Sequence, residues 1–143
     1  MKEIILAAKP AGVGFGIIVI RLNQVNIFNG TYSEIYDYAV DNKSNKRVIF
    51  DIANNCDLLS GISDYIDCHK NSVNSNKTQI IVNTISLNDL LEKSNAPIFI
   101  DYLSLDTEGS ELEILKSFNF QKYIFGLIDV EHNYIEPRRT QIR

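Results

Sequence analysis

Two acidic residues each follow a mostly apolar run near the end of the chain. Asp106 comes directly after the run 98–105, and Glu131 comes directly after the run 124–130. If both runs are parallel strands, their carboxyl ends meet at one edge of a sheet, where open α/β sheets bind ligands. The spacing therefore predicts that these two carboxyl groups lie close together and can serve as acid and base.

Further polar side chains come directly after these two acids. They are Glu108, Glu111, His132 and Asn133. Carboxylates, an imidazole and an amide would then share one edge, a combination suited to proton transfer. Two simpler interpretations stay open. Acids in a first helical turn stabilise the helix, so Glu111 and Glu113 are expected to be capping or surface residues, and His132 can be a structural residue.

The elements that would position these residues are predicted from pattern. Ser110 and Glu113 have the spacing of a capping box that begins a helix. A strand, a helix and a second strand in this order indicate a right-handed crossover between parallel strands. The segment reads as strand, tight turn, helix and strand at 98–105, 107–109, 111–118 and 124–130.

Upstream, the pattern is weaker but still alternates strand and turn. Ser86 can cap a helix whose apolar positions Leu87, Leu90 and Leu91 recur at helical spacing. The turn-forming stretch 41–45 predicts a hairpin between the strands on either side of it. The strands expected in this part are 17–21, 35–40, 47–52 and 79–85, and the least regular stretch is 53–78.

Composition excludes several classes of function. The chain has 143 residues and a net charge of -4, so we expect one soluble, cytoplasmic domain that binds no nucleic acid and no membrane. The basic cluster of Arg138, Arg139 and Arg143 is interpreted as a solvated chain end. Cys56 and Cys68 are expected to be free thiols, and without a second ligand pair at zinc spacing no metal site is predicted.

The glycines Gly12, Gly14 and Gly16 alternate near the start of the chain. A dinucleotide-binding loop needs the spacing Gly-x-Gly-x-x-Gly and must follow a strand and open a helix. These glycines have a different spacing and precede a strand. They are therefore interpreted as a flexible turn.

Residues 106–111 read Asp-Thr-Glu-Gly-Ser-Glu after an apolar strand, and this segment resembles the signature of the FkbM family of methyltransferases. In that family a strand ends in Asp, and x-Glu-Gly-x-Glu opens the next helix. Neighbouring segments resemble the family as well, at 82–91, 118–120 and 130–133, and more weakly at 38–40 and 59–62. The resemblance covers roughly 35–143, whereas 1–34 match weakly.

The resemblance implies a class I methyltransferase with an α/β, Rossmann-like, mostly parallel sheet and flanking helices. It implies transfer of a methyl group from S-adenosylmethionine to a hydroxyl of a small-molecule or saccharide acceptor. Alignment of donor and acceptor would supply most of the rate, with a base to remove the proton. By the same resemblance the catalytic residues are Asp106, Glu131 and His132. The cofactor-binding residues are Asp41, Asp106, Glu108 and Gly109.

Two departures from the family pattern lead us to expect an incomplete domain over 1–143. No acidic strand end with a Gly-rich turn precedes the strand 17–21, and Arg21 takes the place of the acid that binds the ribose. The first cofactor-binding strand and the last strands of the sheet are expected to be lacking. The methyltransferase would then be impaired in this chain, with weak or no cofactor binding.

Two alternatives to a methyltransferase remain at this stage. The first is a non-catalytic remnant or interaction module that self-associates through exposed sheet edges. The second is a hydrolase that uses Asp106 and Glu131 as its acid and base.

Overall fold

The computed structural model describes residues 38–54, 59–66 and 69–142, together with the backbone of the strands at 6–8, 17–21 and 34–36. The expectations for Cys56, Cys68 and the alternating glycines of 9–16 lie outside these residues. Within the described part the chain is a mixed α/β protein, as predicted.

One sheet carries the expected crossover. Its order is β3-β1-β2-β8-β9, with β3 at Glu34–Tyr36, β1 at Leu6–Ala8, β2 at Ile17–Arg21, β8 at Phe99–Asp106 and β9 at Ile124–Val130. The strands β8 and β9 are parallel and joined through a helix, as the sequence predicts. Because β8 lies between β2 and β9, it is an interior strand, which confirms the expectation for the run 98–105.

The prediction of a mostly parallel sheet is wrong, because this sheet is mixed. β2 runs antiparallel to both of its neighbours, β1 and β8. A parallel pair needs a crossover of about a dozen residues or more, and the segment 9–16 between β1 and β2 is too short for one. The antiparallel register places Arg21 opposite Tyr102, while Ile17 lies opposite Asp106. Arg21 therefore lies beside the middle of β8, four residues away from the position opposite Asp106.

A second sheet has the order β4-β7-β5-β6, with β4 at Ala39–Asp41, β7 at Lys77–Ser86, β5 at Arg47–Ala53 and β6 at Gly61–Ile62. The predicted hairpin between β4 and β5 is wrong, because β7 lies between them. The ten residues of β7 pair antiparallel with all seven of β5 and parallel with β4, so this long strand displaces the local pairing. The predicted strand 35–40 is divided into β3 and β4.

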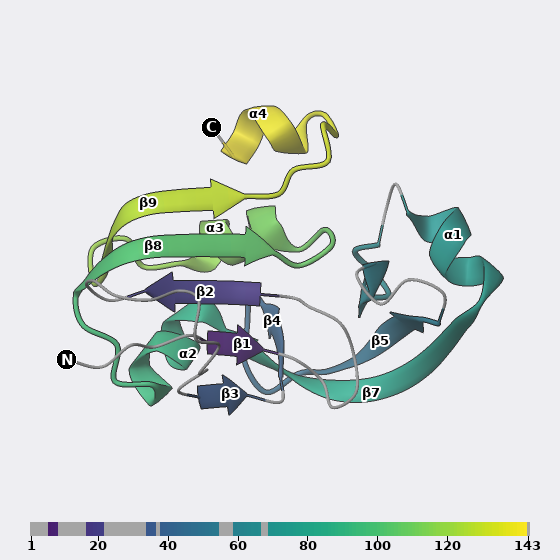
Figure 1. The fold of residues 1–143 in the computed structure, drawn as a ribbon, viewed down its shortest axis with the longest axis horizontal. Coiled ribbons are helices and arrows are strands. Elements are labelled where there is room, and N and C mark those ends of the chain that lie inside the picture. Colours follow the sequence, from purple (N-terminus) through teal and green to yellow (C-terminus); the bar gives the residue numbers. More distant parts are fainter. Residues whose placement is uncertain are drawn as a thin grey trace.

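Helices cover the first sheet on one face (Figure 1). They are α2 at Leu87–Lys93 and α3 at Glu111–Ser117. Ser86 caps α2 as predicted, because its hydroxyl accepts a hydrogen bond of 3.1 Å from Asp89 N–H. Their buried side chains pack against β8 in the main core, which includes Leu87, Leu90, Leu91, Ile100, Leu103, Leu105 and Ile114.

The stretch 53–78, predicted to be the least regular, contains β6 and the helix α1 at Lys70–Ser75. This helix lies at the far end of the ribbon formed by β5 and β7 (Figure 1). The last helix is α4 at Arg138–Ile142. Arg138 and Arg139 are half-buried there, so the expectation of a fully solvated end is wrong for these two residues. None of the described helices is long and apolar enough to cross a membrane.

Candidate functional site

Asp106 and Glu131 come together at the carboxyl ends of β8 and β9. Glu131 N–H donates a hydrogen bond of 3.0 Å to Leu105 C=O, which holds the chain after β9 beside the end of β8. Asp106, Glu108 and Glu131 each offer a carboxylate oxygen, and these oxygens all lie within 4.8 Å of one another. The expected proximity of Asp106 and Glu131 is thus confirmed, while their catalytic roles remain predictions.

The surroundings of Asp106 raise its pKa to about 7. Burial is the largest cause, followed by a hydrogen bond with Glu131 and then by the negative charges of Glu131, Glu111 and Asp129. Two carboxyl groups can share a hydrogen bond only when one of them carries a proton. The other oxygen, Asp106 Oδ1, is buried without a hydrogen-bond partner among the described residues. Asp106 therefore gains or loses its proton near neutral pH.

The turn after Asp106 is tightly packed and left-handed. Glu108 has a φ of 56° and is only 8% exposed, and Gly109 has a φ of 125°. A Cβ atom on Gly109 would lie 2.3 Å from Tyr65 C=O, so no other residue fits there without moving the backbone. Glycine at this position lets the chain bring Glu108 beside the acid pair.

The predicted capping box of Ser110 and Glu113 is wrong. Ser110 makes no capping hydrogen bond, and Glu113 forms an exposed ion pair with Lys116. Glu111 takes over this function from within the helix. Its Oε1 accepts hydrogen bonds from Thr107 N–H at 2.8 Å and Gly109 N–H at 3.0 Å. The carboxylate thus links the first and third residues of the turn. Glu111 is a structural residue, as the simpler interpretation expected.

Asp41, assigned to cofactor binding by the resemblance, lies at the end of β4 and is 2% exposed. Its carboxylate receives Lys46 Nζ at 3.1 Å, Asn42 N–H at 2.7 Å and Tyr65 O–H at 3.1 Å. Burial, with the charge of Asp41 and its hydrogen bond, raises the pKa of Tyr65 to about 12, so this phenol stays a donor. Asp41 therefore supports Tyr65, which packs against Gly109.

His132 and Asn133 lie in a tight turn after β9. Ile135 N–H donates to His132 C=O at 3.1 Å, and the two central residues, Asn133 and Tyr134, have φ values of 49° and 56°. Two positive φ values mark a type I′ turn, which strongly prefers glycine at the second central position. A residue with a side chain costs about 1–2 kcal/mol there.

The two polar side chains of this turn have different partners. Asn133 Nδ2 donates to Glu131 Oε2 at 3.2 Å, so the amide supports the carboxylate. His132 Nδ1 accepts from Tyr134 N–H at 3.0 Å. His132 is not in the group of ligand atoms formed by the three acids. The imidazole is thus fixed by the turn, and its proposed catalytic role stays a prediction.

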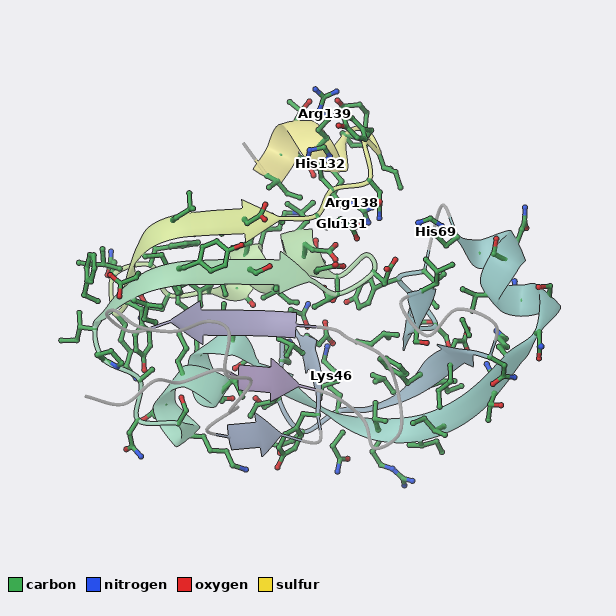
Figure 2. All side chains as sticks on the ribbon, in the orientation of Figure 1. Lys46, His69, Glu131, His132, Arg138 and Arg139 are labelled. Carbon is green, nitrogen blue, oxygen red and sulfur yellow. The ribbon has the colours of Figure 1, made fainter. Side chains whose placement is uncertain are left out.

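Sequence reasoning missed Arg138 as a neighbour of the site. Its Nη1 donates a hydrogen bond of 3.1 Å to Gly109 C=O, which ties α4 to the turn carrying Glu108. Figure 2 shows Arg138 and Glu131 at the same end of the sheet. No local pattern could reveal this contact, since it joins residues 29 positions apart.

A cavity of about 550 Å³ lies between α3, β9 and α4, but it is not lined by the acids of the site. Apolar side chains, including Leu115, Phe120 and Ile128, line it together with the polar Lys116, Asp129 and Gln141. The acid pair and this cavity are therefore separate features.

The three acids could hold a hard divalent cation, which prefers carboxylate oxygens, or could face a positively charged organic group. Asp106 and Glu131 offer carboxylate oxygens within 4.8 Å of each other and share a hydrogen bond, so a proton can pass between them. Their use as the acid and base of a hydrolase stays a prediction.

The sequence matches the family described as the methyltransferase FkbM domain over residues 14–141. The match includes β8, the turn 107–110, α3 and β9, and thus the whole acid pair. No matching curated protein and no matching solved structure was found. Because the match spans most of the chain, the protein belongs to the FkbM methyltransferase domain family.

Proposed function

We propose that this protein transfers the methyl group of S-adenosylmethionine to a hydroxyl group of a small-molecule or saccharide acceptor. Membership of the methyltransferase family supports the reaction type. The observation that carries the proposal is the proton-sharing pair of Asp106 and Glu131 at the carboxyl edge of β8 and β9. S-adenosylmethionine would supply an electrophilic methyl group on a positively charged sulfonium.

The negative charge of the acids at this sheet edge suits a positively charged cofactor. Asp106, Glu108 and Glu131 gather three carboxyl groups, and Asp106 Oδ1 is buried without a partner among the described residues. A positively charged ligand would compensate the cost of placing these acids together. Asp41 fits this role less well, because its carboxylate is already bonded to three donors. We therefore assign the cofactor contact to Asp106, Glu108 and the Gly109 turn.

Asp106 is the proposed general base. With a pKa of about 7 it is ionised in a substantial fraction of molecules at neutral pH and can then accept the proton of the acceptor hydroxyl. Glu131 holds the carboxyl group by a hydrogen bond, and Asn133 in turn holds Glu131. The proton remains within this pair until it passes to water.

Methyl transfer from labelled S-adenosylmethionine to a panel of hydroxylated acceptors tests the proposal. Because cofactor binding is expected to be impaired, we expect slow product formation by the wild-type chain at high cofactor concentration, with a rate that rises with pH around 7 as Asp106 ionises. Calorimetric titration with the cofactor provides a second readout. Binding in the low micromolar range would contradict the expectation of impaired cofactor binding, while no methylated product at any pH would contradict the function.

We also propose, as a second function, self-association through the free side of β9. Among the described residues β9 pairs with β8 alone, and it exposes Ile124 and Leu127 beside Phe99. An apolar edge strand with unpaired backbone groups can pair with the same strand of a second copy. Light scattering after size exclusion should show a dimer in the wild type and a monomer in Leu127→Lys. A monomeric wild type would contradict this proposal.

A further inference from the structure

The turn after β8 holds Glu108 in a position that two physical effects oppose. Glu108 has a φ of 56° and Gly109 a φ of 125°, and a residue with a side chain is disfavoured in this left-handed region. A carboxylate oxygen of Glu108 also lies within 4.8 Å of those of Asp106 and Glu131, so charges of the same sign oppose its approach. The turn therefore needs contacts from other parts of the chain to keep this conformation.

Arg138 provides such a contact at the residue directly after Glu108. Its Nη1 donates a hydrogen bond of 3.1 Å to Gly109 C=O, partly shielded from water. A charged guanidinium makes a hydrogen bond about twice as strong as one between neutral groups. The N–H of Gly109 is held separately by Glu111 Oε1 at 3.0 Å. Both polar backbone groups of Gly109 are thus fixed, the C=O by a residue 29 positions away.

The helix α4 carries Arg138 but contributes little to the core. None of its residues is fully buried, and among the described elements it packs chiefly against α3. Figure 2 shows Arg138 at the same end of the sheet as Glu131, where β9 ends. Removal of the Arg138 guanidinium is therefore expected to release the turn without disturbing the packing of β8 and β9.

We infer that Arg138 is a positioning residue for the binding of the cofactor. By holding Gly109 C=O, it keeps Glu108 beside the acid pair, where the carboxyl groups are proposed to meet the positively charged sulfonium. Arg138 acts through the backbone of the turn and takes no part in proton transfer. The identity of the ligand rests on the proposed function, whereas the effect of Arg138 on the turn does not.

Three variants of the full chain separate the hydrogen bond from the charge. Arg138→Met removes the donors and the charge of the guanidinium, whereas Arg138→Lys keeps a positive charge and N–H donors. Arg139→Met is the matched control, because it removes the same charge from the next position of α4. The guanidinium of Arg139 lies 5.4 Å from the ring centroid of Tyr134 and 3.9 Å from Glu136 Oε1, so it interacts with residues outside the turn 107–110.

Amide hydrogen exchange followed by NMR reports on the turn without any ligand. In Arg138→Met the N–H groups of Thr107 and Gly109 should exchange about tenfold faster than in the wild type, because one charge-assisted hydrogen bond no longer opposes opening of the turn. Exchange should stay at the wild-type rate in Arg139→Met and within about threefold of it in Arg138→Lys. Equal rates at Gly109 in the wild type and Arg138→Met, or faster exchange throughout β8, would overturn the inference.

Kinetics with labelled S-adenosylmethionine test whether the turn serves the cofactor. Arg138→Met should raise the cofactor KM about tenfold, while kcat and the acceptor KM should stay within about twofold of the wild type. Arg138→Lys should restore most of the cofactor KM. An unchanged cofactor KM in Arg138→Met would overturn the inference. Faster exchange at Gly109 in this variant, together with no methylated product from the wild type, would support the role of Arg138 in the turn and contradict the proposed function instead.

Discussion

Two aspartates on neighbouring sheets have opposite electrostatic surroundings. Asp51 on β5 is 3% exposed and receives Lys77 Nζ at 2.7 Å and Gln79 Nε2 at 2.8 Å. Burial raises the pKa of Asp51, but the hydrogen bonds from Lys77 and Gln79 and the charge of Lys77 outweigh burial, so the pKa is lowered. Asp106 on β8 faces other acids, and its pKa rises to about 7.

The difference shows which role the surroundings of each aspartate favour. At Asp51 every nearby group stabilises the charged carboxylate, so the residue is permanently ionised at neutral pH and contributes to the fold. At Asp106 burial and the acids Glu131 and Glu111 oppose ionisation, which makes the native state less stable than it could be. A carboxyl group kept near its titration point is useful for proton transfer.

The largest expected effect is on the reaction. Asp106→Asn removes the proposed base while preserving the size of the side chain. We expect methyl transfer to fall about 100- to 10,000-fold, the usual contribution of a general base. Initial rates with labelled cofactor at saturating acceptor provide the measurement. Asp51→Asn serves as the control, since it should leave the rate of folded protein near that of the wild type.

Breaking the ion pair of Asp51 should cause the largest loss of stability. Lys77→Met leaves a nearly buried carboxylate that keeps its hydrogen bond from Gln79 but loses its ion pair, so the free energy of unfolding should fall by about 2–3 kcal/mol. Urea denaturation provides the measurement. The matched control is Lys116→Met, whose pair with Glu113 is exposed on both sides and should contribute under about 0.5 kcal/mol. Similar losses in the two variants would contradict the assignment of Asp51.

Glu131→Gln sharpens the comparison by making Asp106 more like Asp51. The amide removes a negative charge and can donate to Asp106, so the pKa of Asp106 should fall by about one unit, although burial still holds it above its ordinary value. The midpoint of the pH–rate profile should move to lower pH by the same amount. Asp129→Asn is the control, because its charge is a weaker cause and should move the midpoint less. An unmoved midpoint in Glu131→Gln would exclude coupling of the pair.

The sequence predicts the part of the site that local pattern controls. The apolar runs of β8 and β9 and the cap at Ser86 specify strands and a helix without reference to distant residues, so the meeting of Asp106 and Glu131 follows from parallel pairing alone. The sequence correctly predicts the turn 107–109, but it does not predict that Glu111 accepts the hydrogen bonds of this turn, because three hydrogen bonds to one carboxylate depend on the bent backbone of Gly109.

Pairings between distant segments could not be read in the same way. The turn residues 41–45 favour a local hairpin, and nothing near them reveals that β7 pairs with both β4 and β5. The direction of β2 and the contact from Arg138 to Gly109 cannot be predicted for the same reason. Each depends on a tertiary contact between segments that are far apart in the sequence. The sequence around Asp51 likewise does not reveal that two residues of β7 bond its carboxylate.

The smallest effect is a change of stability with pH, and its sign differs between the two aspartates. The pKa of Asp106 is raised from 3.8 to about 7 in the native state, so the native state retains a proton that the unfolded state releases between about pH 4 and pH 7. Stability therefore falls as the pH rises through this window. Asp106→Asn removes the free-energy cost of ionising this carboxyl group in the native state and should stabilise the protein at pH 8 by about 1 kcal/mol. This is less than the full pKa shift implies, because water reaches part of the carboxyl group.

At pH 4 this gain from Asp106→Asn should vanish, because the wild-type carboxyl group is then protonated in the native state. Asp51→Asn should behave in the opposite way. Its pKa is lowered, so its contribution is present above about pH 4 and is lost as the pH falls through the native pKa. Urea midpoints of both variants at pH 4 and pH 8 measure the contrast. If Asp106→Asn were destabilising at pH 8, as Asp51→Asn should be, the two aspartates would both be structural.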